Sequence, residues 1–315
     1  MNKENAWQNN RRFYDEYIAD MIHTEFPKYE DRIAVGIAGE GSDSFGYDDV
    51  ISRDHDFGTG VCLWLTDEDM YEIGNLLSIK YNEIVDSKER SFYTDRLRER
   101  RGVMTIHDFY SNILRIDCNI NSCTLTDEEW RKLDHTCLAT AVNGEVFHDD
   151  LGIFSNYRRM LLDYYPDNIW REMIAMAMHE FSAALQVNYA RCMTRGDIVA
   201  ANLCKARGLD AAMRLTFLLK RVYPPYYKWT YRALTEIDED DVIAPRLKEL
   251  AKTEITSEAW VGTKYQPNRL NLKDRVVTAT ESIATELSDM LKQAGFINCI
   301  NPYLEADVCK VLEIP

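Results

Sequence analysis

Apolar residues at helical spacing mark the beginning of the chain. The residues that recur at three- and four-residue spacing are Phe13, Tyr14, Tyr17, Ile18, Met21 and Ile22. This periodicity predicts an amphipathic helix, because residues four apart lie on the same helical face. Pro27 marks the end of the helix, since proline removes a backbone donor and interrupts the hydrogen-bond ladder.

Short apolar runs predict the strands of a sheet. They lie at residues 33–38, 57–65, 103–106 and 145–147. The first run is almost continuously apolar, with charged residues before it and glycine after it, which is typical of a strand buried on both faces. The second is rich in β-forming residues and stops at a polar stretch, residues 66–68, that favours the start of a helix.

Helical signals dominate the second half of the chain. Thr126 and Glu129 have the spacing of a capping box, and Gly196-Asp197 can end one helix and cap the next. Long helices are predicted at residues 166–194, 197–221, 238–253 and 271–294. We therefore predict the α+β class, with a mixed-sheet domain over residues 1–152 followed by an all-α helical bundle over residues 153–315.

Composition and charge narrow the functional classes. The 315 residues are 46% hydrophobic, and 37 basic residues against 52 acidic residues give a net charge of −15. This charge argues against a surface that holds duplex nucleic acid or anionic lipid. No apolar run is long enough to span a bilayer, and the polar N-terminus lacks a hydrophobic signal core, so we expect no membrane association and a cytoplasmic protein.

The eight cysteines carry no recognisable metal or disulfide pattern. There is no Cys-x-x-Cys and no cysteine–histidine pair at the spacing of zinc ligands. We interpret most of them as buried thiols that pack as small hydrophobic side chains.

The candidate chemistry lies between the first two predicted strands. Gly39 and Gly41 form a glycine-rich turn, in which the backbone can approach phosphate oxygens and present N–H donors. Asp54 and Asp56 are one residue apart, so a strand would place both carboxylates on one side. Two such carboxylates repel each other unless a cation lies between them, and Mg²⁺ is the expected cation. Ser44 stands where a dinucleotide-binding fingerprint needs glycine, and the stretch has no P-loop lysine.

This stretch resembles a known superfamily. Gly41-Ser42 followed by Asp54-His55-Asp56 is similar to the signature of nucleotidyltransferases, typified by DNA polymerase β and the aminoglycoside nucleotidyltransferases. More closely, residues 39–44 and 52–58 resemble a bacterial group known as a domain of unknown function, DUF4037. Further matches to that group lie at residues 144–149, 162–166, 191, 195–197 and 223–229. The resemblance implies a nucleotidyltransferase fold followed by a helical domain that closes the active site.

The resemblance also implies roles for these residues. Asp54 and Asp56 would hold Mg²⁺ on a nucleoside triphosphate, and the Gly41-Ser42 turn would bind its β- and γ-phosphates. A further carboxylate would deprotonate an acceptor hydroxyl for attack at the α-phosphorus, and pyrophosphate would leave. In the superfamily the position between the two aspartates is usually apolar, whereas here it is His55. We hypothesise that His55 orients an aspartate or contacts phosphate.

The sequence leaves the third carboxylate open among four acids. Asp117 fits the spacing best, while Asp149 belongs to the stronger family match. Asp108 and Glu145 are the alternatives. Each of the four is equally compatible with a turn or a helix cap.

Basic residues of the predicted helical domain complete the candidate site. Lys228 lies in a turn rich in aromatic residues and proline, and the resemblance implies that it reaches the triphosphate. Arg195, with Arg191 one turn earlier, is a second candidate for the triphosphate, although the pair equally fits a surface with ion pairs.

These observations predict a Mg²⁺-dependent nucleotidyltransferase that moves AMP from ATP to a hydroxyl of a small-molecule acceptor. The net charge of −15 favours a cationic or neutral acceptor, and a protein or RNA 3′-end stays open. The alternative is a catalytically degenerate module that binds a nucleotide or a partner in an antitoxin-like or regulatory role. The sequence does not define the oligomeric state.

Overall fold

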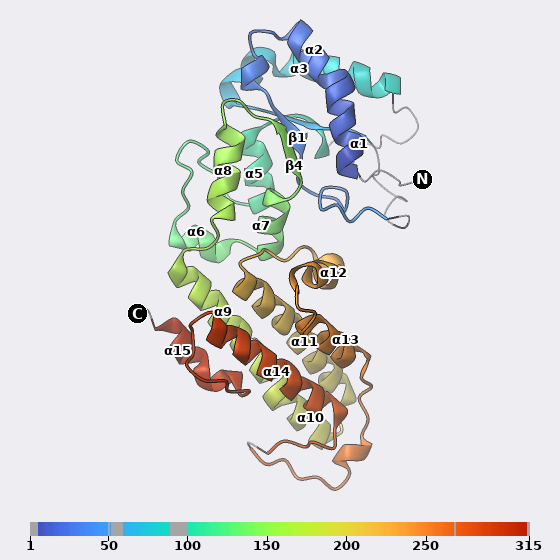
Figure 1. Ribbon diagram of the computed structural model, residues 1–315, viewed down its shortest axis with the longest axis vertical. Coiled ribbons are helices and arrows are strands. Elements are labelled where there is room, and N and C mark those ends of the chain that lie inside the picture. The colour runs from blue at the N-terminus through green and yellow to red at the C-terminus, as the bar shows by residue number, and fades with distance from the viewer. Residues whose placement is uncertain (1–5, 50, 52–58, 89–99, 268, 314–315) are drawn as a thin grey trace. The chain divides into compact units, whose positions relative to one another are not determined.

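The computed structural model describes residues 6–49, 51, 59–88, 100–267 and 269–313. The chain forms two compact units, Met1–Tyr164 and Tyr165–Pro315. Strands lie in the first unit, and the described residues of the second unit form helices without strands (Figure 1). The predicted α+β class is thus confirmed. The helix at Ile153–Leu162, which follows the boundary predicted after residue 152, belongs to the first unit.

A four-stranded mixed sheet organises the first unit. Its strands are β1 (Ala34–Ile37), β2 (Cys62–Leu65), β3 (Gly102–Thr105) and β4 (Glu145–His148). They are ordered β3-β2-β1-β4, with β1 antiparallel to both neighbours and β3 parallel to β2. Gly36 lies opposite Cys62 on one side and Val146 on the other. A Cβ atom at Gly36 would come within 2.4 Å of the Glu145 carbonyl oxygen, so this close pairing needs glycine.

Helices cover both faces of this sheet. They are α1 (Ala6–Phe13), α2 (Ala19–Glu25), α3 (Asp67–Lys88), α5 (Ile106–Leu114), α6 (Asp127–Lys132), α7 (His135–Val142) and α8 (Ile153–Leu162). A π-helical turn at Tyr14–Ile18 joins α1 to α2, which confirms the predicted N-terminal helix. On one face of the sheet, Val35 and Leu63 pack against α1, α2 and α3. On the other face the ring of Trp64 stacks on that of Phe154, with centroids 3.8 Å apart.

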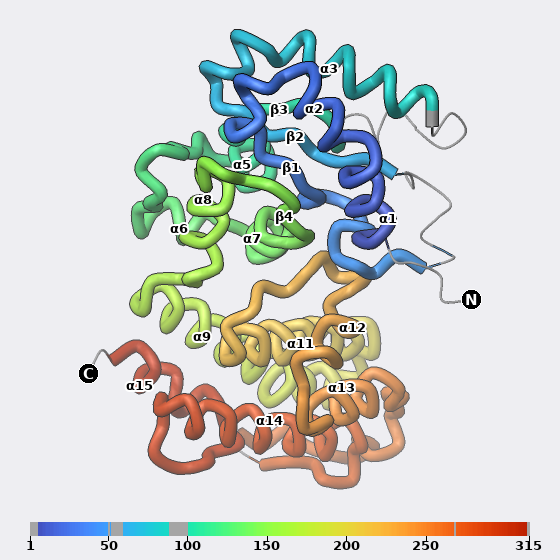
Figure 2. Tube along the Cα trace, turned by 45° about the horizontal axis from the view of Figure 1, so that its top comes forward, coloured from blue at the N-terminus to red at the C-terminus, as the bar shows by residue number. Residues whose placement is uncertain are grey.

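The second unit is built around a long helical run and its antiparallel neighbour. Its helices are α9 (Asp167–Phe181), a π-helical segment (Ser182–Asn188), α10 (Tyr189–Arg195), α11 (Ile198–Lys220), α12 (Tyr227–Ile237), α13 (Ile243–Lys252), α14 (Arg275–Gln293) and α15 (Val308–Leu312). Helix α11 packs along α9, and Figure 2 shows α14 beside α13.

Local sequence signals end and begin these helices. Gly196 has a φ of 73° and ends α10, and the carboxylate of Asp197 accepts the N–H of Ala200 at 3.0 Å. The capping box of Thr126 and Glu129 at α6 is also confirmed. The prediction omitted α12, which begins directly after Tyr226.

Candidate functional site

A glycine turn follows β1 at one end of the sheet. Gly39 and Gly41 have φ values of 100° and 115°, in the left-handed region that side chains rarely adopt. A Cβ atom at Gly41 would come within 2.3 Å of Asp43 Oδ1 and 2.6 Å of Arg100 Nη1. The turn therefore requires glycine at this position, both for its backbone conformation and for the space beside it.

The side chain of Asn143, far away in the sequence, holds the base of this turn. Asn143 accepts the N–H of Gly39 at 2.8 Å and donates its own amide to the Gly39 carbonyl oxygen, also at 2.8 Å. Gly144, next to Asn143, has a φ of 71°, and a Cβ there would lie 1.9 Å from the Ile37 carbonyl oxygen. The start of β4 is thus fastened against the end of β1.

A buried ion pair holds the far side of the turn. Arg101 Nη2 donates to Asp43 Oδ2 at 2.9 Å and to Ser44 Oγ at 3.0 Å. The side chain of Arg101 is completely buried and that of Asp43 is 8% exposed. Trp7 Nε1 donates to the Asp43 carbonyl oxygen at 2.9 Å. Because an unpaired buried charge is costly, this pair fixes the backbone of the turn firmly.

The outer part of the turn keeps donors available. In the described part of the chain, the backbone N–H groups of Gly41 and Ser42 and the Ser42 hydroxyl donate to no acceptor. Both residues are half-buried. Arg100 Nη1 donates to the Glu40 carbonyl oxygen at 3.2 Å, which places a guanidinium beside these N–H groups. Adjacent N–H groups in a turn of this kind make a concave site for an anion.

The two candidate metal ligands lie outside the described residues. These ligands are Asp54 and Asp56, and His55 between them lies outside the described residues as well. The described chain resumes at residue 59, and the N–H of Gly60 donates to the buried Asn10 side chain at 2.8 Å. From there the chain enters β2, whose first residue, Cys62, lies opposite Gly36. This is the end of the sheet that carries the glycine turn. Among the described residues no group of three or more histidine, cysteine or acidic side chains could hold a metal, so the metal site stays a prediction.

The sheet register separates the four candidates for the third carboxylate. Glu145 lies opposite Ile37, at the end of β1 that leads into the turn. Asp149 follows the opposite end of β4, four residues and about 13 Å beyond Glu145 at the usual rise per strand residue. Its carboxylate accepts the N–H of Ser155 at 2.7 Å and stabilises the first turn of α8.

Asp108 and Asp117 belong to helix α5 and to the segment that follows it, and the α5 side chain of Phe109 lies close to Gly39. Helix α5 begins after Thr105, the last residue of β3, and this is the end of the sheet opposite to the turn. Asp108 lies in the first turn of α5. Asp117 Oδ1 contacts Nε2 of His107 at 2.9 Å, and the Asp117 side chain is 95% exposed. This hydrogen bond raises the pKa of His107. The carboxylate of Asp117 therefore has a histidine as its partner.

The predicted basic residues of the second unit lie far from each other. Arg195 is exposed at the end of α10, while the Lys228 ammonium lies 5.3 Å from the ring centroid of Trp229 at the start of α12. The ring of Tyr223 contacts that of Tyr165, just before α9, at 5.3 Å. The run from α9 to α10 covers 29 residues, about 43 Å at 1.5 Å per residue. The structure therefore does not bring Lys228 and Arg195 together.

Residues that hold the turn escaped the sequence analysis. Arg101 is 58 residues from Asp43, and Asn143 is 104 residues from Gly39. No local pattern marks either side chain as a partner of the turn. Arg191, considered with Arg195, donates its Nε to the Tyr265 hydroxyl at 3.3 Å.

The fold and the turn define a two-unit α+β protein with open backbone N–H donors in a glycine turn at one end of a mixed sheet. Residues 130–230 match the family model described as "Domain of unknown function (DUF4037)", which confirms the expected resemblance over that segment. A nucleotidyltransferase-like protein from Exiguobacterium sibiricum 255-15 is similar in structure, at 14% identity and a TM-score of 0.35, over 87% of this chain and 79% of that chain. No curated protein matches significantly. No described helix has the length and hydrophobicity to cross a membrane.

Proposed function

We propose that the chain is a Mg²⁺-dependent nucleotidyltransferase that transfers AMP from ATP to a hydroxyl group of a small acceptor and releases pyrophosphate. The observation that carries this proposal is the glycine turn. The donors of Gly41 and Ser42 have no partner in the described residues, and the turn beneath them is held by Asn143 and the buried Arg101–Asp43 pair. Such a rigid, open set of donors is suited to phosphate oxygens.

The proposed chemistry assigns each group one task. The N–H groups of Gly41 and Ser42 bind the terminal phosphates and orient the α-phosphorus. Asp54 and Asp56, two hard oxygen donors, would hold Mg²⁺, which would neutralise the negative charge of the triphosphate. Glu145 accepts the proton of the acceptor hydroxyl. A bond forms between the acceptor oxygen and the α-phosphorus, the bond to the bridging oxygen breaks, and pyrophosphate carries away the electron pair.

We assign the proton acceptor to Glu145 on the strength of its position. It is the candidate acid that the register places at the end of β1 leading to the glycine turn. Asp149 and Asp117 instead have structural partners, the N–H of Ser155 and the ring of His107. Lys228 stays a candidate for the triphosphate. For the acceptor, the net charge of −15 favours a cationic or neutral small molecule.

Binding calorimetry tests the nucleotide site. ATP, GTP, CTP and UTP are titrated with and without Mg²⁺ into the wild type, the Asp54→Asn/Asp56→Asn variant and a control. The control, Asp15→Asn/Asp20→Asn, removes the same charge from exposed positions of the N-terminal helices. We expect Mg²⁺-dependent binding of ATP by the wild type and the control, and its loss in the first variant. Absence of binding to every triphosphate by the folded wild type would refute the proposal and favour a degenerate module.

A second measurement separates binding from chemistry. Pyrophosphate release is followed with a panel of hydroxyl acceptors for the wild type, Glu145→Gln and Asp117→Asn. We expect Glu145→Gln to bind ATP normally and to lose at least 100-fold in rate, because a general base typically contributes about 10²–10⁴-fold. Asp117→Asn should retain activity. The reverse result would show that the third carboxylate is Asp117.

A further inference from the structure

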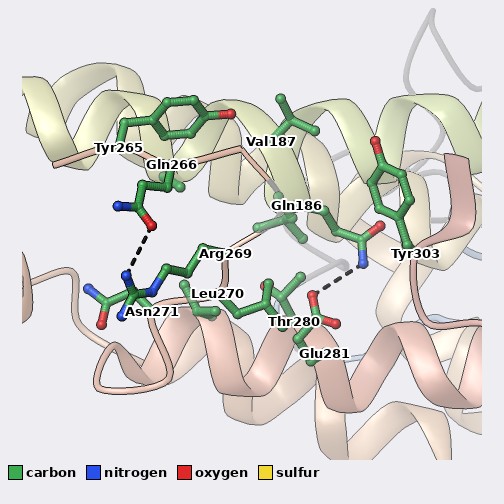
Figure 3. Close-up of a pocket in the computed structure, with 13 residues that line it drawn as sticks. Gln186, Val187, Tyr265, Gln266, Arg269, Leu270, Asn271, Thr280, Glu281 and Tyr303 are labelled. Atoms are coloured by element: carbon green, nitrogen blue, oxygen red, sulfur yellow. Dashed lines mark hydrogen bonds between the residues drawn. The ribbon is translucent and has the colours of Figure 1, made fainter.

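A cavity of about 260 Å³ lies within the second unit. It opens between the π-helical segment Ser182–Asn188, helix α14 and the segment that carries Tyr265 and Leu270 (Figure 3). The walls combine aliphatic side chains such as Leu185 and Val277 with the aromatic ring of Tyr303. Its volume is slightly below that of pockets for drug-sized molecules, about 300 Å³ and above, so it suits a small organic ligand.

Glu281 contributes a carboxylate to this cavity. Gln186 Nε2 donates to Glu281 Oε1 at 3.2 Å and to the Pro302 carbonyl oxygen at 2.7 Å. Gln186 Oε1 also accepts the N–H of Leu304 at 3.3 Å, so the amide is fixed in orientation. No lysine, arginine or histidine within the described ranges forms an ion pair with Glu281. Burial raises the pKa of this carboxyl group, and the hydrogen bond from Gln186 offsets this effect only in part.

The neighbouring residue on α14 adds a second unsatisfied group. Thr280 also lines the cavity, and its side chain is 1% exposed. Its hydroxyl has no hydrogen-bond partner in the part of the chain that the structure describes. Buried hydroxyl groups in proteins are almost always hydrogen-bonded, so an unpaired one at a cavity indicates a missing partner. The π-helical segment opposite, which positions Gln186, is a rare conformation that is frequent at functional sites.

We propose that this cavity binds a small organic cation, an alkylammonium group with an apolar body. The ammonium donates to the Glu281 carboxylate and to the Thr280 hydroxyl, and the carbon chain packs against Leu185 and Leu270. Arg269 also lines the cavity and keeps its positive charge, but it lies beside Asn271 and apart from Glu281 (Figure 3), where its guanidinium donates to Gln266 Oε1 at 3.0 Å. The proposal rests on the second unit alone and is independent of the nucleotidyltransferase assignment.

Three probes of equal length and different charge test this proposal. Hexylamine, hexanol and hexanoate are titrated into the full chain at neutral pH, with binding followed by calorimetry and ligand-observed NMR. The variants are Glu281→Gln and Thr280→Val, and Asp289→Asn is the matched control. Asp289 lies on α14 eight residues further along, about 12 Å, outside the cavity lining. We expect hexylamine to bind at least ten-fold more tightly than hexanol and hexanoate to bind least.

The variants test whether hexylamine binds in this cavity. Glu281→Gln should weaken hexylamine binding at least ten-fold and leave hexanol unaffected, while Asp289→Asn should change neither. Thr280→Val keeps the shape of the side chain and should weaken hexylamine binding several-fold. If circular dichroism shows that Glu281→Gln is unfolded, the hexylamine affinity of Thr280→Val serves as the test instead. Equal binding of the three probes, preference for hexanoate, or full hexylamine affinity in the folded variants would overturn the proposal.

Discussion

The ion pair between Asp43 and Arg101 makes a quantitative prediction about the glycine turn. Asp43→Asn keeps the shape of the side chain but leaves the guanidinium of Arg101, which is completely buried, without a counter-charge. Removing one partner of a buried pair costs about 3–5 kcal/mol of unfolding free energy. Because the asparagine carbonyl can still accept a hydrogen bond from Arg101 Nη2, we expect the lower end, about 3 kcal/mol.

Urea denaturation followed by circular dichroism measures this loss. The slope of the unfolding free energy against urea should stay constant, and the midpoint should fall. Glu128→Gln is the control, since it removes the same charge from an exposed ion pair. In that pair Lys132 Nζ lies 2.7 Å from Glu128 Oε1. Exposed pairs contribute little, so the control should change the midpoint only slightly. A loss in Asp43→Asn no greater than in the control would refute the view that this pair anchors the turn.

Two further predictions concern titratable groups of the first unit. Asp117→Asn should return the raised pKa of His107 towards 6.5, as measured by NMR titration; an unchanged pKa would contradict the observed contact. Because the folded pKa is raised, the stability from this contact is complete below pH 6.5 and is lost as the pH rises through the folded value. Burial raises the pKa of Cys62, so thiol reagents at pH 8 should modify the exposed Cys299 and spare Cys62, as mass spectrometry would show; rapid native modification of Cys62 would contradict its burial.

The strands and several helix ends could be predicted from the sequence because their signals are local. The apolar run at residues 33–38 contains β1, and the capping box at Thr126 opens α6 as expected. The sequence pattern places Lys228 in a turn rich in aromatic residues and proline, and it does not predict helix α12 there. In the structure the prolines lie just before α12, and the Pro225 carbonyl oxygen accepts a hydrogen bond from the Thr230 hydroxyl at 3.0 Å. Proline before a first helical turn is compatible with the helix that follows.

The candidate site was predictable only in its local part. The glycines at 39 and 41 indicate the turn directly, since their φ values exclude other residues. The choice among the acids required the register between β1 and β4, which places Glu145 opposite Ile37. A shift of one residue would place Glu145 on the other face of the sheet, and neither strand specifies the register by itself.

The contrast within the glycine turn gives the strongest argument about its purpose. On its inner side the Asn143 amide, the two Nη groups of Arg101 and the Trp7 indole each have a specific partner. The buried ion pair adds stability to the turn, but stability alone does not require the N–H groups of Gly41 and Ser42, which have no acceptor among the described residues, to stay open. Rigid support is useful where donors must keep their positions while they bind a charged ligand, since preorganisation lowers the cost of binding. The support beneath Gly41 and Ser42 is therefore consistent with the phosphate-binding role that we propose for them.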